Sequence, residues 1–184
     1  MKKRIPNFLT LFRLILVPVM YFSVVKLNQP LGSIVALLVF IIASISDYFD
    51  GMYARKYKNI TDFGKIMDPI ADKLLVIVAI FLLVIKPIAI IPLWILLVIV
   101  IREILVTLFR FYYANKGIFI AANIWGKLKT VFQIISIIIA FLVYILSQEF
   151  VSILELYDIV NFIFWITVII TILSAITYTI GGKK

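Results

Sequence analysis

The chain of 184 residues is 65% apolar, against roughly half in a typical soluble domain, so we expect an integral membrane protein. It contains no cysteine and no histidine, which excludes disulfides, thiolate nucleophiles, zinc–thiolate sites and imidazole bases. Proton transfer is therefore left to carboxylates or lysines. The net charge of +9 favours anionic lipid head groups and phosphorylated substrates as partners. We expect no nucleic-acid partner, because aromatic and basic residues do not interleave as a nucleic-acid groove requires.

Hydropathy predicts an all-α fold with six transmembrane helices in a single domain of residues 1–184, each helix near the ~20 residues that a bilayer requires. The start MKKR before an apolar run resembles a signal peptide. However, Arg13 interrupts the run and no small-x-small cleavage site follows, so we expect a retained first helix. In chain order, the expected helices are Phe8–Lys26, Leu31–Met52, Gly64–Ile85, Ile88–Tyr113, Ile124–Leu146 and Asp158–Ile180.

Lysine and arginine residues are concentrated on one side of the predicted spans, which sets their orientation. That side receives the N-terminus, residues 55–65, residues 110–129 and the C-terminus. The other side receives Lys26 and Lys86, together with three acidic residues between positions 149 and 158. Because the side richer in Lys and Arg faces the cytoplasm, we expect both termini there (N-in/C-in).

The acidic residues of one segment predict a metal site. Five of the nine acidic residues lie within residues 47–72, between two apolar runs. Four of them recur at helical spacing, two on each of two consecutive predicted helices: Asp47, Asp50, Asp68 and Asp72. Carboxylates packed that closely repel unless a cation lies between them, and oxygen ligands alone favour Mg²⁺, Mn²⁺ or Ca²⁺. The alternative, a solvated carboxylate in a loop, suits Asp62, which has no periodic partner.

The same segment suits phosphate chemistry. A two-metal carboxylate cluster can clamp a diphosphate and stabilise the leaving oxygen, while one carboxylate acts as base on an attacking hydroxyl. Gly51 and Gly64 let a ligand approach the backbone, although helix packing would explain either glycine alone. Arg55 offers a forked donor to a phosphate. We therefore expect metal-dependent phosphoryl or phosphatidyl transfer at the cytoplasmic surface, with a lipid substrate entering sideways from the bilayer.

Several cations lie deeper in the predicted spans than the orientation requires, and together they predict a basic pocket for phosphates beside the carboxylates. They are Arg13, Lys73, Arg102, Arg110, Lys127 and Lys129. Snorkelling of the side chain to the membrane interface would explain Lys127 or Arg110 singly. Arg102 and its neighbour Glu103 are alternatively expected to form a structural ion pair within the fourth span.

One motif resembles the signature of the CDP-alcohol phosphatidyltransferase family at every position: Asp47-x2-Asp50-Gly51-x2-Ala54-Arg55-x8-Gly64-x3-Asp68-x3-Asp72. The resemblance implies six transmembrane helices, usually a homodimer, and a CDP-linked lipid donor. It implies that Asp47, Asp50 and Asp68 bind metal. Asp72 would also bind metal and would be the base that deprotonates the acceptor alcohol. The residues implied to line the cytidine diphosphate site are Gly51, Ala54, Arg55 and Gly64.

Further patches resemble the bacterial branch of this family that makes phosphatidylglycerol phosphate. They are residues 5–13 with Pro18, residues 68–73, residues 102–104 with Arg110, and residues 126–130 with Gln133. The branch implies CDP-diacylglycerol as donor, sn-glycerol 3-phosphate as acceptor, CMP as leaving group, and a bacterial cytoplasmic membrane with its active site at the cytoplasmic face. Our candidates for the acceptor phosphate are Arg110, Lys127 and Lys129; for the nucleotide side they are Asn7, Thr10 and Lys73.

Other functions remain open at this point. Within the family, phosphatidylglycerol as acceptor would give cardiolipin and keeps a phosphate, as inositol phosphate does, whereas serine would leave the basic pocket unexplained. Outside the enzyme class, intramembrane acids around a divalent cation are also typical of a transporter. A transporter site is expected near the midplane, between repeated halves. Here the acids lie at one surface and the sequence shows no internal repeat.

Overall fold

The computed structural model describes most of the chain. The backbone is described for residues 5–57, 62–116, 124–148 and 156–181. Side chains are described for residues 11–46, 70–113, 116, 124–148 and 156–177.

Every regular element in these ranges is an α-helix, as the hydropathy pattern predicts. The helices are α1 (Ile5–Lys26), α2 (Leu31–Tyr57), α3 (Asp62–Val84), α4 (Leu93–Asn115), α5 (Ile124–Ser147) and α6 (Leu156–Gly181). Four of the six begin and end within three residues of the predicted bounds, and α2 ends five residues later than predicted.

The fourth helix begins later than predicted. We expected it to start at Ile88, but α4 begins at Leu93. Pro92 directly precedes α4, has no backbone N–H to donate, and disfavours a helical conformation of the residue before it, Ile91. Ala89 has a φ of 46°, in the left-handed region that a helix interior excludes. The run from Ile88 to Ile91 is consequently part of the connection before α4, in which the three isoleucines are buried and Ala89 is exposed.

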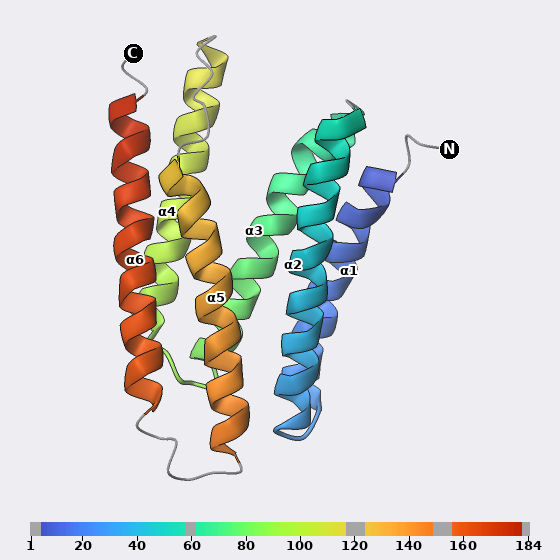
Figure 1. Cartoon of the computed structure of the whole chain (residues 1–184), viewed down its shortest axis with the longest axis vertical. Coiled ribbons are helices and arrows are strands. Elements are labelled where there is room, and N and C mark those ends of the chain that lie inside the picture. Colours follow the sequence, from blue (N-terminus) through green and yellow to red (C-terminus); the bar gives the residue numbers. More distant parts are fainter. Residues whose placement is uncertain (1–4, 58–61, 117–123, 149–155, 182–184) are drawn as a thin grey trace.

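The helices form two groups of three, which Figure 1 shows side by side. In one group α1 packs against α2 and α3, and in the other α6 packs against α4 and α5. Helix α3 joins the groups through α4 and α5, and α2 also packs against α5. The end of α2, the start of α3, the end of α4 and both chain termini lie at the same end of the bundle, the upper end in Figure 1.

Apolar side chains fill the bundle and also cover its outside. Phe40, Ile80 and Phe141, from three different helices, are each 0% exposed in the core. The outward faces carry large apolar side chains as well, such as Phe111 and Phe162, which are 67% and 65% exposed. Within the described side chains, Ile124–Ser147 and Leu156–Thr177 are long and apolar enough to cross a membrane. A bundle that is apolar inside and outside suits lipid better than water.

Candidate functional site at the α3–α4–α5 junction

The backbone confirms that the acidic motif lies on two helices. Helix α2 continues to Tyr57, past the predicted end at Met52, so the first half of the motif lies on one unbroken helix. Helix α3 begins at Asp62, which places Gly64, Asp68 and Asp72 on a second helix. Asp62 was interpreted as a loop residue, and this was wrong, because it is the first residue of α3.

The structure does not describe most side chains of the motif. This applies to the predicted metal ligands Asp47, Asp50 and Asp68, and to the predicted nucleotide-site residues Asn7, Thr10, Gly51, Ala54, Arg55 and Gly64. Their roles stay predictions. Asp72, the last aspartate of the motif, is described, and the site is built around it.

Asp72 lines a pocket where three helices meet. Its walls come from α3, α4 and α5: Asp72, Lys73, Val76, Ile77, Glu103, Lys129, Thr130 and Gln133. The space between these side chains is about 270 Å³, part of it open to the surroundings. The structure thus brings a predicted base together with two predicted phosphate-binding lysines, from helices that are far apart in sequence.

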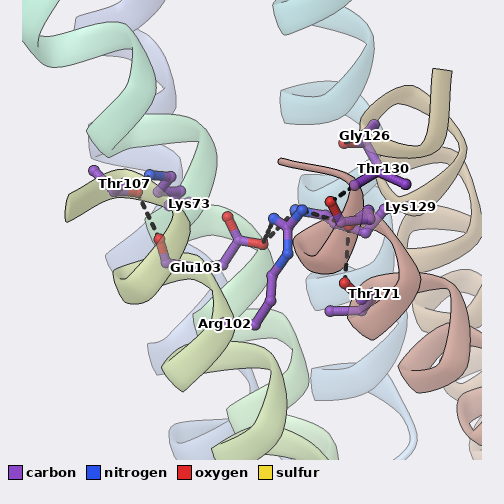
Figure 2. A network of polar contacts seen from close by, with 10 residues as sticks. Lys73, Arg102, Glu103, Thr107, Gly126, Lys129, Thr130 and Thr171 are labelled. Atoms are coloured by element: carbon purple, nitrogen blue, oxygen red, sulfur yellow. Dashed lines mark hydrogen bonds and ion pairs between the residues drawn. The ribbon is translucent and has the colours of Figure 1, made fainter. Parts of the chain in front are cut away.

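An ion network forms the α4 side of this pocket (Figure 2). Arg102 donates from Nη1 to Glu103 Oε1 at 2.9 Å, so the predicted ion pair between these two residues is confirmed. Lys129 on α5 donates to the same oxygen, a contact that the sequence did not predict. Arg102 also donates from Nη2 to the hydroxyl of Ser174 on α6. All four side chains are buried, and burial makes the pairing necessary, because an unpaired buried charge costs several kcal/mol.

A second set of contacts ties α3 to α4 beside the network. Lys73 donates to the hydroxyl of Thr107, and Thr107 donates to the backbone carbonyl of Glu103 at 2.6 Å. Figure 2 shows Lys73 and Thr107 next to each other, with Glu103 one turn away along α4. We predicted Lys73 for the nucleotide side, and it lies in the same pocket as Asp72 and Lys129.

The other two predicted acceptor-phosphate residues lie outside the pocket walls. Lys127 is exposed, because two residues along a helix turn its side chain about 200° away from that of Lys129. Arg110 is exposed on α4, two turns beyond Glu103, and is close enough to Lys73 for their charges to interact. Of the three predicted acceptor-phosphate residues, Lys129 lines the pocket described above, and the roles of Arg110 and Lys127 stay predictions.

Helix α5 also contributes Thr130 and Gln133 to the pocket, two residues for which no role was predicted. The sequence contains a signal for Gln133. Lys129, Gln133 and Ser136 follow the i, i+4, i+7 spacing of one helix face within an otherwise apolar helix, and all three are buried. Helix α6 repeats this pattern with Thr167, Thr171 and Ser174.

Comparison with known proteins places the chain in a family. The model of the CDP-alcohol phosphatidyltransferase family matches residues 3–173. A protein of Bacillus subtilis (strain 168) named CDP-diacylglycerol–glycerol-3-phosphate 3-phosphatidyltransferase is 37% identical over 187 residues, covering 95% of this chain and 92% of that protein. A protein of the same name from Rickettsia bellii (strain RML369-C) is 36% identical, covering 99% of this chain and 97% of that protein.

A third protein of that name, from Haemophilus influenzae, is 38% identical over 74% of this chain and 75% of its own length. The similarity thus covers nearly the whole chain in two relatives and includes both helices of the acidic motif. It agrees with the resemblance seen in the motif itself. The chain therefore belongs to the CDP-alcohol phosphatidyltransferase family.

Proposed function

We propose that this protein transfers the phosphatidyl group from CDP-diacylglycerol to sn-glycerol 3-phosphate. The observation that carries the proposal is the position of Asp72, which lines one pocket with Lys73 and Lys129. This pocket combines a carboxylate that can accept a proton with cations that can attract a phosphate. The names of the similar proteins from Bacillus subtilis and Rickettsia bellii support the choice of donor and acceptor.

The proposed reaction is a displacement at phosphorus. Asp72 takes the proton of the acceptor's primary hydroxyl, and that oxygen forms a bond to the phosphorus next to the diacylglycerol. The bond from this phosphorus to the oxygen that links it to CMP breaks, and CMP leaves with that oxygen. The products are phosphatidylglycerol phosphate and CMP.

The expected cofactor is a pair of Mg²⁺ or Mn²⁺ ions, and the donor set fits them. Asp47, Asp50, Asp68 and Asp72 supply carboxylate oxygens alone, the ligands that these hard cations prefer. In addition, the backbone places two of these residues on α2 and two on α3. When bound, the ions would neutralise the diphosphate and stabilise the leaving oxygen.

The remaining predicted residues divide between donor and acceptor. For the donor, we propose that Gly51, Ala54, Arg55 and Gly64 line the cytidine diphosphate site, with Asn7, Thr10 and Lys73 beside them. For the acceptor, Arg110 and Lys127 would attract the phosphate from outside the pocket, and Lys129 would meet it inside. Lys129 lines the pocket, and its ammonium group has three N–H donors, so it can donate to Glu103 and to a phosphate at the same time.

We further propose that all six helices span a bacterial cytoplasmic membrane, with both termini and the pocket opening at the cytoplasmic face, and that the protein is a homodimer. Three observations support the membrane topology. The six helices alternate in direction and both termini lie at one end of the bundle (Figure 1). In addition, large apolar side chains are exposed on its outside. The proposed location puts soluble glycerol 3-phosphate and membrane-bound CDP-diacylglycerol within reach of one pocket.

The test is an acceptor comparison with purified protein in detergent, CDP-diacylglycerol and either Mg²⁺ or Mn²⁺. CMP release is followed separately with sn-glycerol 3-phosphate, serine, inositol phosphate and phosphatidylglycerol. We expect release with glycerol 3-phosphate, and its loss when EDTA removes the metal. Release with another acceptor only would keep the family chemistry and overturn the proposed acceptor. No release with any acceptor would contradict the transferase and favour a divalent-cation transporter.

A further inference from the structure

On the buried polar face of α5, Gln133 differs from Lys129 and Ser136 in its hydrogen bonding. Lys129 is paired with Glu103 on α4, and the Ser136 hydroxyl shares a hydrogen bond of 2.7 Å with Thr167 on α6. Gln133 lies between them, is 2% exposed, and its Nε2 has no hydrogen-bond partner among the described residues. Leaving a buried amide group unpaired costs free energy, because the group has lost its hydrogen bonds to water. A ligand that supplies the missing hydrogen bond would recover this cost.

Gln133 is also a wall of the pocket that contains Asp72. It lies one helical turn farther along α5 than Lys129, and Val76 lies one turn farther along α3 than Asp72. Both helices run in the same direction in the bundle, away from the end with the chain termini (Figure 1). Gln133 and Val76 therefore form the inner part of the pocket. Because Val76 and Ile77 are apolar, Gln133 is the polar group that a ligand reaching this depth can contact on the α3 and α5 walls.

We propose that the side-chain amide of Gln133 hydrogen-bonds to the secondary hydroxyl of the acceptor and makes the enzyme selective for a three-carbon acceptor that carries this hydroxyl. The inference rests on the proposed function. In glycerol 3-phosphate, the attacking hydroxyl is at one end of the carbon chain and the phosphate at the other. With the first at Asp72 and the second at the cations, the C2 hydroxyl is the remaining polar group.

The chemistry of the two groups is complementary. An amide is neutral, so it competes poorly with lysine or arginine for a phosphate. A hydroxyl both donates and accepts, so it can satisfy either end of the amide. A site built to hydrogen-bond a substrate hydroxyl rejects the analogue that lacks it, because the buried polar group is then left unpaired.

The test compares sn-glycerol 3-phosphate with 3-hydroxypropyl phosphate, which lacks only the secondary hydroxyl. For the wild-type protein we expect kcat/KM to be about 10- to 100-fold higher for glycerol 3-phosphate, the effect of one hydrogen bond to a buried amide. In Gln133→Met, which keeps the length of the side chain and removes its polar atoms, this ratio is expected to fall to about one. Equal kcat/KM values in the wild type would overturn the inference without any variant.

Thr171→Val is the matched control. Thr171 on α6 is also buried with an unpartnered side-chain oxygen among the described residues, but it does not line the pocket. We expect this variant to keep the wild-type acceptor ratio. A Gln133→Met protein that loses turnover of both acceptors equally, or that keeps the wild-type ratio, would contradict the specific contact. The proposed function fails separately, if the wild-type protein uses neither acceptor.

Discussion

Two neighbouring regions of the bundle are both buried and polar, but they differ in how their groups are paired. One is the ion network of Arg102, Glu103, Lys129 and Ser174, and the other is the pocket wall at Gln133. In the network, Glu103 accepts from two cations on two helices. At the pocket wall, the Nε2 atom of Gln133 has no partner among the described residues. The ion pairs link the helices and fix Lys129 at the pocket wall, whereas the unpaired amide of Gln133 beside the cavity is available to a ligand. Four predictions test the pocket and the network, from the largest expected effect to the smallest.

Asp72→Asn tests the pocket as a catalytic site. Asparagine keeps the shape of the side chain but cannot accept a proton, so we expect kcat to fall about a thousand-fold, the usual contribution of a positioned base. The measurement is CMP release with saturating glycerol 3-phosphate, with circular dichroism as a check of folding. Turnover close to that of the wild type would remove Asp72 as the base.

Glu103→Gln tests the network as a structural element. The substitution leaves Arg102 and Lys129 buried with a neutral amide between them, so we expect the free energy of unfolding to fall by about 3–5 kcal/mol. The measurement is unfolding in mixed micelles as the fraction of a denaturing detergent is increased.

Asp158→Asn is the matched control for Glu103→Gln, because it also replaces an acid by its amide but at an exposed position in the first turn of α6. We expect it to cost less than about 1 kcal/mol, the usual contribution of an acid at a helix N-terminus. Equal stability losses in the two variants would contradict a structural role specific to the network.

Arg110→Ala tests whether attraction of the phosphate extends beyond the pocket. Arg110 is exposed two turns from Glu103, so its removal should weaken acceptor binding without changing the chemical step. We expect the KM for glycerol 3-phosphate to rise about tenfold, with a smaller change in the KM for CDP-diacylglycerol, as for one charged hydrogen bond. An unchanged acceptor KM would exclude Arg110 from acceptor binding.

Ser136→Ala tests the hydrogen bond between two neutral hydroxyl groups that links α5 to α6. It removes the hydrogen bond to Thr167, and we expect a loss of about 1 kcal/mol in the free energy of unfolding. Thr167→Val removes the same bond from the other side, so the double variant should lose less than the sum of the single ones. Strict additivity would mean that the two hydroxyls do not stabilise each other.

The helices and the acidic motif could be predicted from the sequence because both depend on local spacing. An apolar run near the thickness of a bilayer predicts a helix, and carboxylates at helical spacing predict a shared face. The predicted start of α4 was wrong, because hydropathy takes no account of backbone conformation. Pro92 lacks an N–H, and Ala89 has a positive φ. Likewise, Asp62 was assigned to a loop because it has no periodic partner, although it begins α3.

The pairing of distant charges could not be predicted in the same way. Arg102 and Glu103 are neighbours in sequence, so their contact was expected, whereas Lys129 and Ser174 reach the network from other helices. Which cation meets which acid depends on how α4, α5 and α6 rotate against each other, and this is decided by packing of the whole bundle. For the same reason, the sequence grouped Lys127 with Lys129, although α5 turns them to different sides.

The most direct measurement of the central claim follows the acceptor into its product. Purified protein is incubated with CDP-diacylglycerol, Mg²⁺ and glycerol 3-phosphate labelled in its carbon atoms, and the label in the lipid extract is compared with the CMP released. We predict one label in lipid for each CMP, and almost none of either with Asp72→Asn. CMP release without label in the lipid would contradict the proposed transfer to glycerol 3-phosphate.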